Sequence, residues 1–418
     1  MEDNSYFKTQ RFFVDKEKST NSINSDDLLA LISNEELKEL LINKYDLDQN
    51  LVIHIDGIDQ VFDHVKRYTK RFDLIRLEVA DDQITSYIQF DDITNEPRYI
   101  FKIASGLEDD VLYEDLEVTA TYDSVNLFYK DKDLTQYVKS LKKHKNMSNL
   151  LDELNVSWKN HYARNPKLVK KRLYRILKHK DNYYLKSINT NSYKEYGIKE
   201  SFVVAILELF KLKNENSDFD FEIASILLSE SEIDLIISKK KGVKLGNGGV
   251  VRNSISIRNN DQGNASFGIY STLEIYTEKG LAEKIFVFPN KDDQAIKTQI
   301  KSAHTVTVDK FVEIHSEISV LLNKGEELKD NYHFLKDTVD FDQLRQKIEE
   351  RLITNNSAFK GVIGLKDLFK RDKAGHVDNL AKLLSLCGKA ELLDMNSDIR
   401  FKLRYLISNV LLYNRNSF

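Results

Sequence analysis

The sequence contains very little of several residue types that define particular protein classes. Among 418 residues there are one cysteine, three prolines and 15 glycines, which excludes disulfide-stapled, collagen-like and proline-rich disordered chains. The longest uninterrupted apolar run, residues 202–207, is far shorter than the roughly 20 residues that span a bilayer, so no membrane partner is expected. The start Met1-Glu2-Asp3 lacks the features of a secretory signal, and Cys387 cannot form an internal bridge, so we expect a cytoplasmic location.

The composition that remains is that of a foldable globular chain. Hydrophobic residues make up 41% of the sequence and charged residues 31%. The length is close to three times that of a typical domain of about 150 residues, which predicts two or three domains rather than a single core.

Charge is distributed very unevenly along the chain, although the formal net charge is only -4. Residues 1–128 contain 28 acidic and 13 basic side chains, whereas residues 129–186 contain 5 acidic and 16 basic ones. Such an asymmetry indicates either an anionic partner or an acidic part that packs against a basic part of the same chain.

The hydrophobic pattern predicts an α+β fold with antiparallel sheets, flanking helices and a helical C-terminal region. Alternating short runs such as 74–79, 85–90 and 99–103 indicate strands, and 125–129 is assigned to a strand as well. From these patterns we expect four segments: an acidic α/β N-terminal domain (1–133), a basic helical connector (134–186), a central antiparallel sheet domain (187–330) and a helical C-terminal region (331–418).

The basic connector carries the strongest functional signal. Asn165-Pro166 resembles a helix start, and the spacing of Leu168, Leu173 and Ile176 predicts a helix over 167–180. Cations beside aromatic residues suit nucleic acid, because lysine and arginine neutralise phosphates and aromatic rings stack on bases. Two other interpretations explain the same basic residues without nucleic acid: they form an ordinary solvated helix face, or they dock onto the acidic first third of the chain. The candidate nucleic-acid contacts here are Lys142, Lys143, Lys145, Arg164, Lys167, Lys170, Lys171, Arg172, Arg175 and Lys178.

A second group of candidates lies on the central sheet. A period of two over 250–258 and 265–276 places Arg252 and Arg258 on the same face as Tyr270 and Tyr276. If the two strands pair, this face presents arginines next to tyrosines, which can bind phosphates and stack on bases. Open antiparallel sheets also carry such residues without any ligand.

Signatures of enzymes and metal sites are mostly missing. The nine histidines are dispersed, and neither zinc spacing nor a phosphate-binding loop is present, so no metal and no cofactor are expected. A magnesium-dependent nuclease needs carboxylates that converge on one ion. Asp73, Glu78 and Asp234 are candidates for such a role, but no complete spacing supports them.

Residues 183–323 resemble a family of uncharacterised phage- and plasmid-borne proteins. The resemblance is carried by Tyr193-Lys194-Glu195-Tyr196, by the strand-rich stretch 254–276 and by Ser302-Ala303-His304-Thr305; Lys279-Gly280 stands where the family has a Cys-Asn-Gly element. It implies the biology of a mobile element or of phage defence and supplies no known catalytic residue. His304 is the position that it singles out, with an unknown role.

Together these observations predict a bacterial DNA- or RNA-binding protein of a mobile element or antiviral defence system, which binds phosphates through its basic segment. Two alternatives stay open: a metal-dependent nuclease of the same setting, and a protein–protein adaptor that touches no nucleic acid. Whether the chain is an enzyme, whether it self-associates and whether it has a protein partner in the same system are not decided by the sequence.

Overall fold

The computed structural model describes residues 5–15, 17–48, 50–91, 95–143, 147–216, 219–245, 248–262, 267–277, 284–288, 299–324 and 340–412. It has an α+β fold whose strands pair almost entirely antiparallel, as predicted. The chain forms two compact units. Unit 1 contains residues 1–66, 196–260 and 266–418, and unit 2 contains residues 67–195 and 261–265.

These two units differ from the four predicted segments. The basic connector 134–186 is not a separate helical element, because its strands complete the sheet of unit 2. The helical C-terminal region is likewise part of unit 1, since its apolar side chains share one core with the central sheet.

Unit 1 is built on an eight-stranded sheet with the strand order β1-β10-β11-β13-β14-β15, in which β12 pairs with β13 and β16 with β14. Unit 1 also contains a separate two-stranded sheet, which is formed by β2 (Ser22–Asn24) and β3 (Val52–His54). The strands of the large sheet are β1 (Gln10–Phe13), β10 (Phe221–Leu228), β11 (Glu232–Lys239), β12 (Val243–Lys244), β13 (Gly249–Asn260), β14 (Phe267–Thr277), β15 (Ile285–Val287) and β16 (Gln299–Ser302).

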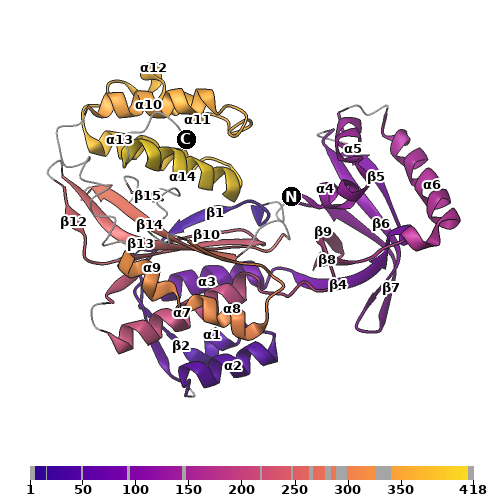
Figure 1. Cartoon of the computed structure of the whole chain (residues 1–418), viewed down its shortest axis with the longest axis horizontal. Helices are drawn as coiled ribbons and strands as arrows, with labels where there is room; N and C mark the ends of the chain where they lie inside the picture. The colour runs from indigo at the N-terminus through magenta and orange to yellow at the C-terminus, as the bar shows by residue number, and fades with distance from the viewer. Residues whose placement is uncertain are drawn as a thin grey trace. The chain divides into compact units, whose positions relative to one another are not determined.

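Helices cover both faces of this sheet (Figure 1). On one side lie α1 (Ser25–Leu29), α2 (Glu35–Tyr45), α3 (Ile58–Thr69), α7 (Ile198–Glu215), α8 (Val308–His315) and α9 (Ile318–Lys324). On the other lie α10 (Phe341–Thr354), α11 (Leu365–Phe369), α12 (Arg371–Ala374), α13 (Leu380–Glu391) and α14 (Ser397–Leu411). Antiparallel sheets commonly leave one face in water, but here every residue of β10 is buried.

Unit 2 is a small barrel. Its strands are β4 (Asp73–Ala80), β5 (Ile84–Phe90), β6 (Pro97–Glu108), β7 (Val111–Ala120), β8 (Lys171–His179) and β9 (Asn182–Asn189). They follow the order β4-β8-β9-β7-β6-β5, and a further pairing of β4 with β6 closes the sheet on itself. A short turn, η2 (Asp81–Gln83), separates β4 from β5, so the two act as one long bent strand.

This connectivity is that of the OB-fold, a five-stranded Greek-key barrel. The β4/β5 strand pairs with both β6 and β8, the pair β7–β9 is parallel, and helices connect β7 to β8. Gly106 lies where β4 and β6 meet: a Cβ atom at this position would lie 3.0 Å from Val79 Cγ2 and 3.4 Å from Leu77 Cβ. The absence of a side chain therefore lets the barrel close.

The connection from β7 to β8 contains α4 (Ser124–Tyr129), η3 (Lys130–Lys132), α5 (Thr135–Leu141), α6 (Asn149–Arg164) and η5 (Pro166–Leu168). The predicted strand over 125–129 is wrong, because these residues form α4. Its Phe128 ring packs edge-on against Phe101 of the barrel, with 5.1 Å between centroids. Asn155 of α6 exchanges two hydrogen bonds with the Ser86 backbone, which holds α6 against β5.

The predicted helix over 167–180 is also wrong, because most of it is strand β8. Leu173, Tyr174, Arg175, Ile176 and Leu177 are all buried, so β8 is enclosed on both faces. A strand covered on both sides loses its alternation of polar and apolar residues, and its apolar run then resembles a buried helix.

Candidate functional site

Arg175, a predicted nucleic-acid contact, is completely buried in unit 2. Its guanidinium donates to both carboxylate oxygens of Glu195, at 2.7 and 2.5 Å. It also donates to Asp261 Oδ1 at 2.6 Å and to Ser187 Oγ at 3.1 Å. A residue with 0% side-chain exposure cannot reach an outside phosphate, so this candidate is wrong.

Arg172 is engaged in a similar way. It donates two hydrogen bonds, of 2.8 and 2.6 Å, to Asp81 Oδ1, and its side chain is 13% exposed. Lys178 is half-buried, and its ammonium lies 5.7 Å from the centre of the Tyr183 ring. The acidic and basic parts of the sequence therefore pair at Arg172, whereas the partners of Arg175 lie outside residues 1–128.

Other cations of the basic segment lie on the surface of unit 2. Arg164 is the last residue of α6, Lys167 lies in η5, and Lys171 begins β8; all three are exposed. Lys170 is exposed as well and lies 3.3 Å from Asp131, with both side chains more than half exposed. An ion pair on the surface contributes little to stability, and it leaves the Lys170 ammonium accessible to solvent. We call Lys159, Arg164, Lys167, Lys170 and Lys171 the α6 cation cluster; among the described contacts, only Lys170 pairs with a carboxylate.

The remaining candidates of the segment lie near the end of α5. Lys142 and Lys143 are exposed, and no described side chain forms an ion pair with either. Lys145 lies outside the described residues. Lys142 also lines a cavity, described below, together with Lys139.

The four candidates of the central sheet lie in unit 1, and the open face predicted for them is wrong. Arg252 contacts Glu222 at 2.9 Å and Glu274 at 2.5 Å, and its guanidinium lies 5.0 Å from the Tyr276 ring centre. Arg258 and Tyr270 both pack against Phe401 of α14.

At Arg258 and Tyr270 the physical reason is α14, whose Phe401 covers both side chains. α14 also places Arg404 2.7 Å from Asp234 and 2.9 Å from Glu391. Arg252 of the sheet and Arg404 of α14 therefore neutralise buried carboxylates of the protein itself, whereas Arg258 lies 3.7 Å from the exposed Asp398.

The carboxylates considered for a nuclease do not converge. Asp73 and Glu78 are in unit 2, whereas Asp234 is in unit 1, where Arg404 and a hydrogen bond from Ser256 engage it. No group of three or more metal-ligating side chains occurs in the described part of the chain. His304 is buried in the turn between β16 and α8.

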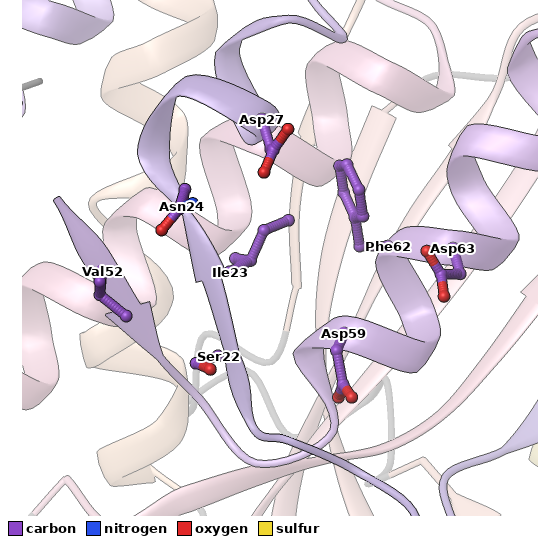
Figure 2. Close-up of a pocket in the computed structure, with 8 residues that line it drawn as sticks. All are labelled: Ser22, Ile23, Asn24, Asp27, Val52, Asp59, Phe62 and Asp63. Atoms are coloured by element: carbon purple, nitrogen blue, oxygen red, sulfur yellow. The ribbon is translucent and has the colours of Figure 1, made fainter. Parts of the chain in front are cut away.

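A cavity of about 310 Å³ in unit 1 is lined by three aspartates, Asp27, Asp59 and Asp63 (Figure 2). Asp59 lies at its edge and accepts hydrogen bonds from the Thr20 backbone, at 2.7 Å, and from the Ser19 hydroxyl. The Asp59 carboxylate is therefore already hydrogen-bonded by residues 19 and 20. Three aspartates in the lining do not by themselves identify a ligand.

A cavity of about 340 Å³ in unit 2 lies between β6, β7, α4 and α5. Its lining includes Arg98, Tyr99, Tyr122, Lys139 and Lys142. The Tyr99 hydroxyl donates to the Val138 carbonyl, and burial raises the pKa of this tyrosine to about 12, so it stays neutral. Sequence reasoning missed Arg98, which lies in the acidic stretch 1–128, and Tyr122, which no local pattern marks as a ligand contact.

No protein-family model, curated protein or solved structure matches the chain. None of the described helices combines the length and the apolar character that a membrane crossing requires.

Proposed function

We propose that the chain binds nucleic acid and that unit 2 supplies the interface. The observation that carries this proposal is the α6 cation cluster: five exposed cations within residues 159–171, of which only Lys170 has a described carboxylate partner. Arg164 lies in the last turn of α6, where the helix dipole favours a cation. Exposed lysine and arginine release counterions when they meet a phosphate backbone.

Two further features support nucleic acid as the partner. OB-fold barrels bind oligonucleotides or oligosaccharides, although a fold alone does not establish a function. Two aromatic residues, Trp158 and His161, lie in α6 beside the cation cluster, and their rings meet edge-on with 5.4 Å between centroids. Aromatic faces accept unstacked bases, so single-stranded nucleic acid is the form that we expect. A cytoplasmic location and the setting of a mobile element or phage-defence system complete the proposal.

Fluorescence anisotropy tests the proposal directly. The full chain is titrated into labelled single-stranded DNA, single-stranded RNA and duplex DNA at several salt concentrations. The triple variant Arg164→Gln, Lys167→Gln, Lys171→Gln should weaken binding and reduce the slope of log Kd against log salt by about two, since each phosphate contact contributes roughly 0.7 to 0.9.

A matched control removes the same charge elsewhere. Lys360, Lys373 and Lys389 are exposed lysines of unit 1, and their replacement by glutamine should leave the slope unchanged. Binding that does not depend on salt, or an equal loss in both triple variants, would refute the proposed interface.

A second function, that of a protein–protein adaptor, is favoured by the hairpin between β6 and β7. Leu107, Val111 and Leu112 near its tip are 47%, 56% and 56% exposed. Exposed apolar clusters of this kind occur at protein interfaces. Pull-down from a native host with the wild type and with Leu107→Ser, Leu112→Ser distinguishes this function: a partner lost only in the variant supports it, and an identical set of captured proteins refutes it.

A further inference from the structure

The cavity between β6, β7, α4 and α5 of unit 2 combines cations with an aromatic ring. Lys139 and Lys142 are three residues apart at the end of α5, so their side chains lie on one face of the helix. Arg98 is a third cation in the lining, paired with Asp91 at 3.2 Å and half exposed. Among the described residues of the lining, Asp123 is the only acidic one.

Tyr122 lines this cavity in a backbone conformation that its residue type disfavours. Its φ angle is +50°, in the left-handed region where a bulky side chain crowds the backbone. It follows Thr121 in a tight turn that is closed by a hydrogen bond from the Ser124 amide to the Thr121 carbonyl, 3.1 Å long. The first central position of a turn with positive φ is normally occupied by glycine. Strained residues of this kind concentrate at functional sites.

The wall of the cavity also carries an amide with an unused acceptor. Asn126 of α4 donates through its Nδ2 atom to Asp123, whereas its Oδ1 atom is buried and accepts from no described residue. Buried acceptors are normally satisfied, by protein or by another molecule. Because this oxygen has almost no accessible surface, a ligand in the cavity reaches it only when the Asn126 side chain turns.

We propose that this cavity binds a single unpaired nucleotide, with its phosphate at Lys139 and Lys142 and its base against Tyr122. A volume of about 340 Å³ is at the lower end of the range for small-molecule sites, which fits one nucleotide rather than several. The inference rests on the proposed function, because it adds to the α6 cation cluster a second site that selects unpaired bases.

Isothermal titration calorimetry of the full chain tests this with AMP, ribose 5-phosphate and inorganic phosphate as probes. The wild type should bind AMP more tightly than ribose 5-phosphate by on the order of ten-fold, since stacking one base on an aromatic ring is worth a tenfold or more in affinity. Absence of AMP binding at millimolar concentration, or equal affinity for AMP and ribose 5-phosphate, would overturn the inference.

Two variants separate the base from the phosphate. Tyr122→Gly relieves the left-handed backbone, so its melting temperature should not fall, while its affinity for AMP should drop to that for ribose 5-phosphate. Lys139→Gln, Lys142→Gln should abolish binding of all three probes. Tyr137→Ala, which removes an exposed tyrosine of the same helix outside the cavity, should behave as the wild type. An unchanged affinity of Tyr122→Gly for AMP would overturn the base contact.

The outcome can be distinguished from that of the proposed function. If oligonucleotides bind and the response to salt depends on the α6 cation cluster, but AMP does not bind, only the cavity inference fails. If AMP binds and the cavity variants abolish it, but no oligonucleotide binds, the cavity stands and the proposed function fails.

Discussion

Replacing Arg175 by methionine should strongly destabilise unit 2. Arg175 and Lys186 face Glu195 and Asp261 in a network with two positive and two negative charges, and the Tyr193 hydroxyl donates to Asp261 at 2.7 Å. The Arg175 side chain is 0% exposed and that of Asp261 6%, so water cannot replace the lost bonds. Arg175→Met therefore removes the buried partner that Glu195 and Asp261 share, and leaves Glu195 with the more exposed Arg76 and Asp261 with Lys186.

The size of the effect follows from this burial. Removing one partner of a buried ion pair costs about 3 to 5 kcal/mol. With a urea dependence of about 2 kcal/mol per molar, the unfolding midpoint should fall by about 2 M. The double variant Arg175→Met, Asp261→Asn removes one charge of each sign, so its loss should be smaller than the sum of the two single losses.

The chain offers both a selective probe and a matched control for this experiment. Its only tryptophan, Trp158, lies in α6 of unit 2, so fluorescence in urea reports the unfolding of that unit. Arg76 approaches the same Glu195 at 3.5 Å, but its side chain is 42% exposed. Arg76→Met should therefore cost less than about 1 kcal/mol. Equal shifts for Arg76→Met and Arg175→Met, or strict additivity in the double variant, would refute the reasoning.

Three further predictions concern titration and packing. Burial lowers the pKa of His315 to about 4, below its ordinary value of 6.5, so the fold favours the neutral ring. The free energy of unfolding should therefore fall by about 3 kcal/mol as the pH drops from 6.5 to 4. Over the same pH range the urea midpoint of His315→Gln should fall less than that of the wild type. Burial also lowers the pKa of Lys132 to about 8, so above that pH the unfolded chain binds more protons than the folded one, and the free energy of unfolding should rise between pH 8 and the ordinary lysine pKa of 10.5. NMR titration of the Lys132 Cε signal, assigned with Lys132→Arg, measures this pKa. A titration midpoint near 10.5 would contradict the prediction. Gly106→Val should cost roughly 1 to 3 kcal/mol by overpacking the closure of β4 on β6, measured by Trp158 fluorescence in urea, and an unchanged midpoint would show that the barrel does not close there.

Much of the fold follows from local pattern. The strands over 74–79, 85–90 and 99–103 are confirmed, and so is the helix over 201–212, which is a long apolar run buried on almost every side. The pattern fails in β8, since burial on both faces removes the alternation that identifies a strand. It also fails in α4, where a short run of β-favouring residues is helical because Phe128 packs against the end of the barrel.

The candidate sites were less predictable, for a different reason. Local sequence gives the position of a charge but not its distant partner. Arg175 and Asp261 are 86 residues apart, and Arg404 and Asp234 are 170 residues apart. The same applies to Tyr122, whose value as a candidate depends on a backbone angle and on two lysines of another element.

The interrupted course of unit 1 through the sequence has a consequence for synthesis on the ribosome. The edge strand β1 pairs with β10, so the pairing of Gln10 with Leu228 cannot form until a further 218 residues have been synthesised. At about 5 to 20 residues per second, this delay is roughly 10 to 40 s. The barrel strands emerge during that interval, yet Asp261 follows later still, so the nascent barrel holds Arg175 for some seconds without one of its counterions. A transient need for chaperones should therefore arise before residue 261 is translated.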